Sequence, residues 1–176
     1  MQVITRNNIE EPLKLDKITQ RIENLCYGLD SVIDPVKITL DIANQIKDKI
    51  KTRELDELSC LICLQQITTH PDFGIIAARI AINNHHKDNS LNFKEFIEKA
   101  YNNKDILGNS APLISEELKK IVDEHGDQIV EWIDYDRDYN LNCFGFKTLV
   151  RAYLLKTIDA KYIEKPGDMF MRVSLG

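Results

Sequence analysis

The segment from Ile75 to Ile82 is apolar on nearly every side of a helix, and this feature constrains the fold more than any other. Only Arg79 interrupts the segment with a charge. A helix of this kind is usually buried on most sides, so several further elements must pack around it. Apolar residues at helical spacing occur both before and after the segment, which indicates that those elements are helices too. We therefore expect a mainly α protein.

The first half of the chain contains signals for a short β-hairpin and three helices before this one. Residues 2–6 and 11–15 have the character of strands, and Asn7-Asn8 between them tolerates the positive φ of a tight turn. Asp16 is expected to cap the first helix and Gly28 to end it. A hairpin and four helices are enough chain to bury one compact core.

Prolines and capping residues mark the next helix starts. Asp34-Pro35 places a capping carboxylate before a proline at the first helical position. Thr52 is expected to cap the third helix, and His70-Pro71-Asp72 ends that helix and opens the fourth. The second helix is expected to continue through isoleucines spaced by four residues, Ile38, Ile42, Ile46 and Ile50.

A polar stretch over residues 87–90 separates the first half from a second, helical half. We expect the domain boundary there, with one domain over residues 1–90 and another over residues 91–176. The apolar run Met169–Val173 needs a surface to pack against, and little sequence remains to cover it. The second half is therefore expected to be an incomplete domain.

Charge and hydropathy exclude several classes of function. The net charge is −5, so the basic excess typical of nucleic-acid-binding proteins is missing. No segment reaches the ~20 apolar residues of a membrane span, and the start of the chain does not resemble a signal peptide. We expect neither a nucleic acid nor a membrane as partner. The expected location is the cytoplasm, where the four cysteines remain reduced thiols.

Some motifs invite a chemical interpretation that their surroundings do not support. Cys60-x-x-Cys63 lies in mid-helix on an apolar face, so we interpret it as core thiols rather than a redox pair. Asp134-x-Asp136-x-Asp138 lacks the glycine and the final glutamate of a calcium loop, and the spacing of the histidines fits no zinc site. We expect no metal site. Because no basic stripe accompanies them, four aromatic residues are expected to lie in the core: Trp132, Tyr135, Phe144 and Phe146.

Cationic side chains occur where a phosphate would bind, at the hairpin and the helix after it. Arg6 ends the first strand, and Lys17 lies in the first turn of that helix. A helix N-terminus offers free N–H groups and a positive dipole end, so a cation there costs roughly 0.3–1 kcal/mol unless an anion is bound. On spacing alone, solvated surface charges remain the alternative interpretation.

Longer motifs extend this observation along the whole chain. They include Val3-Ile4-x-Arg6, Asp16-Lys17-Ile18-Thr19-x-Arg21-Ile22, Asp34-Pro35-x-x-Ile38-Thr39 and Thr68-Thr69-His70-Pro71-Asp72-Phe73, followed by Tyr135-Asp136-Arg137-Asp138-Tyr139 and Met171-Arg172-Val173-Ser174. In this order they resemble the start of eukaryotic-type ribonucleotide reductase large subunits. The resemblance implies an N-terminal β-hairpin packed on a four-helix ATP-cone, followed by a helical, incomplete N-terminal part of the reductase catalytic domain.

In that family the ATP-cone is an allosteric switch in deoxyribonucleotide synthesis, which ATP turns on and dATP turns off in most members. The resemblance implies ATP or dATP, with Mg²⁺ on its phosphates, as an effector rather than a permanently bound cofactor. It implies that Arg6, Lys17 and Lys87 face the phosphates and that Ile18 packs on the base or ribose. The full set of implied contacts is Thr5, Arg6, Glu11, Pro12, Leu13, Lys14, Leu15, Asp16, Lys17, Ile18, Thr52, Asp56 and Lys87.

The hairpin departs from the family pattern at its tip. Thr5 stands where members usually carry lysine, and Asn7-Asn8 where they carry Asp-Gly. A charge-assisted contact contributes roughly 1.5–3 kcal/mol, so we expect weaker nucleotide binding here.

The resemblance also implies partners. The family's radical-bearing and redox cysteines lie beyond the matched segment, so no residue here is expected to be catalytic and the chain alone is expected to reduce no ribonucleotide. It would be a fragment, a truncated product or one piece of a split large subunit. It would work with the rest of that subunit or a companion chain carrying the barrel, with a radical-generating small subunit, and in a homo-oligomer of the full enzyme. The alternative function is a stand-alone nucleotide-sensing or protein-interaction module with a decayed or repurposed ATP-cone.

Overall fold

The computed structural model describes residues 1–176 and divides them into two compact units, residues 1–84 and 85–176. Helices dominate both units, and the only sheet has three short strands, which confirms the mainly α class. None of the helices combines the length and the apolar character that crossing a membrane requires.

The sheet of the first unit has the strand order β2-β1-β3. β1 (Gln2–Ile4) runs antiparallel to β2 (Glu10–Pro12) and parallel to β3 (Ile50–Lys51). Asn8 has the positive φ, 59°, that the turn between β1 and β2 was expected to need. The expected helix through Ile50 is wrong, because Ile50 pairs with Val3 in the sheet.

Four helices follow the hairpin, as expected: α1 (Leu15–Leu25), α2 (Pro35–Ala43), α3 (Thr52–Gln65) and α4 (Asp72–Asp88). Asp34 caps α2, since its carboxylate accepts the N–H groups of Val36 at 2.9 Å and Lys37 at 3.3 Å. Asp16 is not the cap of α1. It lies inside the first turn, where its charge favours the helix dipole.

Two other helix limits differ from the expectation by one or two residues. Thr52 is the first residue of α3, and Lys51 occupies its N-cap. α1 ends at Leu25 with Cys26 at its C-cap, so Gly28 lies in the following turn, where it has a φ of +70°. Shifts of this size are ordinary at helix ends, which fray.

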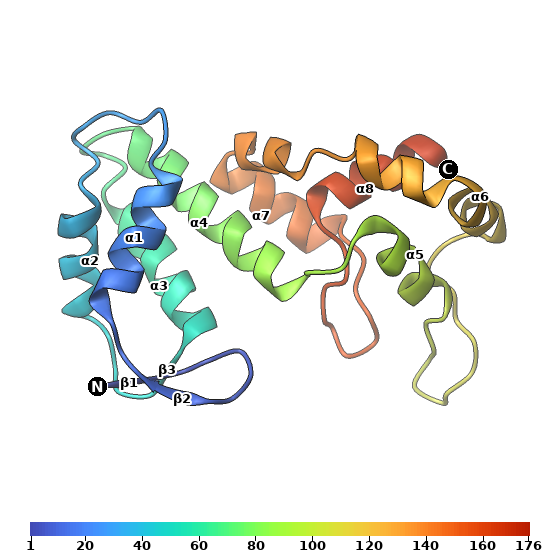
Figure 1. The fold of residues 1–176 in the computed structure, drawn as a ribbon, viewed down its shortest axis with the longest axis horizontal. Helices are drawn as coiled ribbons and strands as arrows, with labels where there is room; N and C mark the ends of the chain where they lie inside the picture. The colour runs from blue at the N-terminus through green and yellow to red at the C-terminus, as the bar shows by residue number, and fades with distance from the viewer. The chain divides into compact units, whose positions relative to one another are not determined.

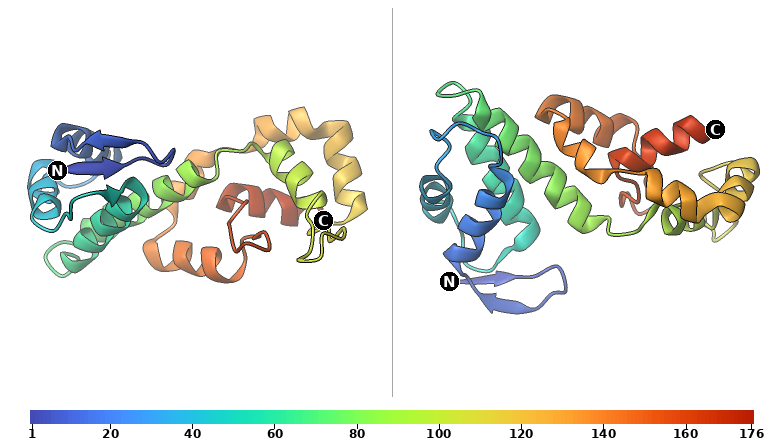
Figure 2. Two further views of the ribbon diagram at one scale, coloured as in Figure 1. Left: turned by 90° about the horizontal axis from the view of Figure 1, so that it is seen from below. Right: turned by 45° about the horizontal axis from the view of Figure 1, so that its top comes forward.

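The core of the first unit lies among its four helices, with the sheet at the end where α1 and α3 begin (Figures 1 and 2). α4 supplies the apolar segment that the sequence singled out, and most of its side chains are buried. Cys60 and Cys63 are buried as expected. The largest fully buried aliphatic side chains of this unit include Ile38, Ile42, Ile76, Ile80 and Ile82.

The second unit is helical, with α5 (Phe93–Tyr101), α6 (Glu116–Trp132), the 3₁₀ helix η1 (Tyr135–Asn140), α7 (Cys143–Ala152) and α8 (Pro166–Leu175). Its core forms between α5 and α6, and Ile163 from the segment before α8 joins it. The core residues are Phe93, Phe96, Ile97, Ala100, Leu118, Val122, Ile129 and Ile163.

The expectation that four aromatic residues of this unit lie in the core is partly wrong. Phe146 is buried, but Trp132 is 66% and Phe144 83% exposed. Trp132 lies on α6 and Phe144 on α7, and the buried residues of these helices lie at other positions. The exposure of the two aromatic side chains therefore depends on their position on the helix and not on their hydropathy.

Candidate functional site

Two helices begin at the sheet of the first unit. β2 ends at Pro12, three residues before α1, and β3 runs directly into α3. The N-cap residues of these helices are Lys14 and Lys51, and neither side chain makes a capping hydrogen bond. The first turns of α1 and α3 thus present N–H groups that no N-cap side chain accepts from, at the positive ends of two helix dipoles.

Asp56 is the anionic centre of this region. Its side chain on α3 is 4% exposed, and it is paired with two arginines that are themselves mostly covered. Arg6, just after β1, lies 3.1 Å from its Oδ2 through Nη2, and Arg21 on α1 pairs with Oδ1. Both carboxylate oxygens are therefore engaged by guanidinium groups.

Asparagines near the end of α4 complete the cluster. Arg6 donates to the side-chain oxygen of Asn84, and Arg21 Nε donates to that of Asn83 at 3.4 Å. Two guanidinium groups share one carboxylate, so these five side chains together carry a net positive charge. They come from the hairpin turn and from α1, α3 and α4. A buried cluster with excess positive charge is a suitable place for a phosphate oxygen to bind.

Arg21, Asn83 and Asn84 were not among the expected site residues. Arg21 was present in the motif that begins at Asp16, and it lies one turn beyond Lys17 on the same helix. That spacing was the available signal for Arg21. No sequence signal pointed to the two asparagines, because only the folded structure brings this part of α4 into contact with Arg6 and Arg21, which lie more than 60 residues earlier in the chain.

Lys17 and Glu11 form a second, more open pair. Lys17 Nζ lies 3.9 Å from Glu11 Oε2, and the lysine side chain is 70% exposed. An exposed pair of this length contributes little to stability, so Lys17 is available to an anion at small cost. Thr5 uses its hydroxyl to accept the N–H of Ile9 at 3.1 Å, which shapes the hairpin turn.

The other expected contacts vary in accessibility. Ile18 is buried in the face of α1 that packs on the core, so little of its surface is open to a base or ribose. Thr52 is half-buried, one turn before Asp56 on α3. Lys87 is exposed in the last turn of α4, within the second unit. The segment between Glu11 and Lys17 is mostly exposed, and contains Pro12, Leu13, Lys14, Leu15 and Asp16.

Comparison with known proteins assigns the same part of the chain to one family. Residues 1–88 match the ATP cone domain. The whole chain is 46% identical to a ribonucleoside-diphosphate reductase large subunit of Plasmodium falciparum and 44% identical to one of Danio rerio. A large chain of the same reductase from Saccharomyces cerevisiae is 43% identical.

These matches cover all of this chain but only a fifth of each relative, 22% in Plasmodium falciparum and Danio rerio and 20% in Saccharomyces cerevisiae. The similarity continues past residue 88, so the second unit is related to reductase large subunits as well. The chain belongs to the ATP cone domain family, in the form that begins ribonucleoside-diphosphate reductase large subunits.

Proposed function

We propose that residues 1–88 bind ATP or dATP, with Mg²⁺ on the phosphates, and thereby control the activity of a ribonucleoside-diphosphate reductase. The observation that carries the proposal is the Arg6–Asp56–Arg21 cluster beside the first turns of α1 and α3. Cationic side chains beside the positive ends of two helix dipoles form the kind of site that a polyphosphate needs. Membership of the ATP cone family supports the choice of adenine nucleotide.

The nucleotide binds by exchanging partners within this cluster. Arg6 turns one donor from Asp56 or Asn84 to a phosphate oxygen, and Arg21 keeps the carboxylate paired meanwhile. Lys17 and Lys87 contribute further phosphate contacts. The carboxylates of Glu11 and Asp56 accept hydrogen bonds from the ribose and base, and the Thr52 hydroxyl donates or accepts one.

The segment from Glu11 to Lys17 supplies the rest of the contacts. It connects β2 to α1 and carries the open Lys17–Glu11 pair. Thr5 cannot replace the lysine that the family resemblance implies at its position, because its side chain carries no charge; its hydroxyl accepts the N–H of Ile9 within the hairpin turn. We therefore expect nucleotide affinity below that of members with the lysine.

Calorimetric titration with ATP and with dATP, each with Mg²⁺, tests the proposal. Lys17→Ala is expected to weaken triphosphate binding about 10- to 100-fold, from the loss of roughly 1.5–3 kcal/mol of charge-assisted contact. The melting temperature should stay unchanged, because Lys17 is largely exposed.

Lys120→Ala is the matched control. Lys120 is equally exposed and also pairs with a glutamate, Glu116, at 2.9 Å, but it lies on α6. Lys87→Ala should behave like Lys17→Ala. An affinity that Lys17→Ala and Lys120→Ala reduce equally, or no binding of either nucleotide at millimolar concentration, would contradict the assignment.

The similarity to reductase large subunits also suggests which partners this chain has. We propose that the chain acts together with the polypeptide that forms the rest of a reductase large subunit, whether joined to it or as a companion chain, and with a radical-generating small subunit. In the full enzyme this regulatory segment belongs to a homo-oligomer.

A further inference from the structure

Helix α4 continues without a break across the boundary between the two units (Figure 1). Its residues Asn83 and Asn84 each accept a hydrogen bond from an arginine of the candidate nucleotide site. The next two residues, His85 and His86, belong to the second unit. Four consecutive residues make up about one helical turn, so a shift or rotation of this turn moves all four side chains together.

The imidazole of His85 is enclosed by the second unit. It is buried, and its Nε2 lies 2.8 Å from the backbone carbonyl oxygen of Glu164. A carbonyl oxygen only accepts, so the imidazole donates this hydrogen bond. The rings of Phe146 and Tyr162 face the imidazole edge-on, each with its centroid 5.6 Å away. Because the packing is close on several sides, His85 cannot move without displacing the segment before α8.

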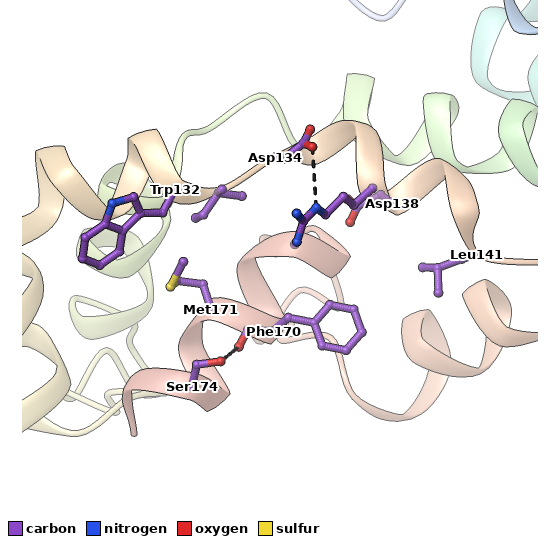
Figure 3. A pocket seen from close by; sticks show the side chains of 10 residues that line it. Trp132, Asp134, Asp138, Leu141, Phe170, Met171 and Ser174 are labelled. Atoms are coloured by element: carbon purple, nitrogen blue, oxygen red, sulfur yellow. Dashed lines mark hydrogen bonds and ion pairs between the residues drawn. The ribbon is translucent and has the colours of Figure 1, made fainter.

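His86 connects the same turn of α4 to η1. Its Nε2 donates to Oδ2 of Asp138 at 2.8 Å, and this carboxylate is buried. A hydrogen bond to a buried carboxylate is charge-assisted and therefore strong. Figure 3 shows Asp138 on η1, where it lines a pocket of about 330 Å³ between η1, the end of α6 and α8. A movement of His86 therefore reaches η1 and the wall of this pocket.

Buried contacts fasten η1 and the segment before α8 to the rest of the second unit. Tyr135 of η1 donates its hydroxyl hydrogen to Asp168 of α8 at 2.5 Å. Glu164 is fully buried and pairs with Arg172 of α8 at 2.6 Å, while its other oxygen accepts the N–H of Leu155 at 2.8 Å. The groups that the two histidines contact thus belong to one buried frame, in which a displaced polar group finds few other partners.

We propose that this turn of α4 couples nucleotide binding to the second unit by loosening the hydrogen bond from His86 to Asp138, a proposal that rests on the nucleotide site argued above. When Arg6 turns its donor to a phosphate oxygen, the buried side-chain oxygen of Asn84 loses a partner. A buried acceptor without a donor is unfavourable, so the turn shifts until Asn84 is paired again. The same shift lengthens the contact between His86 and Asp138 and releases η1 from α4.

Coupling of this kind is reciprocal, which makes it measurable from the second unit. If nucleotide binding weakens the contact between His86 and Asp138, a contact that is already weak favours nucleotide binding. Asp138→Asn keeps the shape of the side chain and an acceptor oxygen but removes the charge. Calorimetric titration of the full chain with ATP and Mg²⁺ should show about fivefold tighter binding in this variant, since a hydrogen bond to a charged acceptor is stronger than one to a neutral acceptor by about that factor.

Asp136→Asn is the matched control. Asp136 lies on the same 3₁₀ helix as Asp138 but is exposed, so the variant removes the same charge and leaves the contact with His86 in place. Its ATP affinity should equal that of the unaltered chain. If Asp138→Asn binds ATP no more tightly than Asp136→Asn, with both variants folded at the assay temperature by circular dichroism, the coupling is rejected.

The unaltered chain gives a second readout, because it contains only four histidines, whose imidazole resonances can each be assigned with a His→Gln variant. In ¹H–¹⁵N spectra the ring resonances of His85 and His86 should move as ATP is added, whereas that of His125, exposed on α6, should not. Unmoved resonances of His85 and His86 in a chain that calorimetry shows to be saturated with ATP would overturn the coupling and leave the proposed function intact. A chain that binds neither ATP nor dATP would reject both.

Discussion

Asp56 is the side chain that holds the candidate nucleotide site in place. Its replacement in Asp56→Ala removes the counter-charge from Arg6 and Arg21, whose side chains are only 28% and 21% exposed. Breaking a buried ion pair from one side costs about 3 kcal/mol, because the remaining charges stay desolvated and unpaired. Urea unfolding followed by circular dichroism should show a loss of this size.

Glu57→Ala is the control for that change. Glu57 lies next to Asp56 in sequence on α3 and also pairs with an arginine, Arg53, at 3.5 Å, but both side chains are more than half exposed. Surface pairs contribute about 0–1 kcal/mol, so Glu57→Ala should hardly move the transition. Similar losses in the two variants would show that Asp56 is not a buried structural charge.

Because His85 is buried, we expect the unfolding free energy of the second unit to fall in acid. Burial lowers the pKa of His85 below its ordinary 6.5, and the hydrogen bond to the Glu164 carbonyl opposes this only in part. Below pH 6.5 the unfolded chain therefore binds a proton that the folded chain does not. The contribution of His85 to the unfolding free energy is fully present above pH 6.5 and is lost as the pH falls through the lower, folded-state pKa.

Urea unfolding at pH 7.5 and pH 5.5 checks this prediction. His85→Gln keeps a hydrogen-bond donor but does not titrate, so its unfolding free energy should fall less on acidification than that of the unaltered chain. His125→Gln, at an exposed position on α6, should leave the pH dependence as it was. If His85→Gln responds to acid as strongly as the unaltered chain, burial of a neutral imidazole is not the cause.

Among the helices, α2 tests whether a local signal also has a local energetic effect. Asp34→Ala removes the acceptor for the N–H groups of Val36 and Lys37, so the unfolding free energy should fall by about 1 kcal/mol. Asp34→Asn should retain most of the stability, since asparagine caps helices as well as aspartate does. A loss that is the same in both variants would attribute the effect to the charge rather than to the cap.

Elements set by such local signals were predicted correctly from the sequence. Asp34-Pro35 begins α2 because the cap and the proline act within four residues of each other. β3 was missed because nothing near Ile50 specifies a strand. Its partner Val3 lies far away in the sequence, and the isoleucine spacing up to Ile50 equally fits a helix. Long-range pairing thus overrode the local pattern.

In the candidate site, too, some residues were predicted from the sequence and others became apparent only in the fold. Arg6 and Asp56 were expected at one site, and the structure brings them into contact, but their mutual pairing and the presence of Arg21 were not expected. Sequence spacing identifies residues that share a helix face, whereas Arg21 meets Asp56 across two helices. The exposure of Trp132 was also missed, since hydropathy does not distinguish an aromatic residue of the core from one at the surface.

At the scale of the whole molecule, the extent of α4 determines where the ATP cone domain can be separated from the rest of the chain. The contact-based division falls between Asn84 and His85, inside this helix, whereas the ATP cone family extends to residue 88, where the helix ends. A chain of residues 1–88 keeps α4 intact and retains Lys87, while a chain of residues 1–84 loses its last turn. We expect the longer chain to fold cooperatively and to bind ATP within a few-fold of the full chain.

The shorter chain separates two explanations of that result. It retains Arg6, Arg21, Asp56 and Asn84, so its fold should persist with somewhat lower stability, since a frayed helix end loses about one turn of hydrogen bonds. Its ATP affinity should fall by about 10-fold or more, because a charge-assisted phosphate contact from Lys87 is missing. Equal ATP affinity in residues 1–84 and 1–88, measured by calorimetry on folded samples, would remove Lys87 from the site and place nucleotide recognition entirely within the first unit.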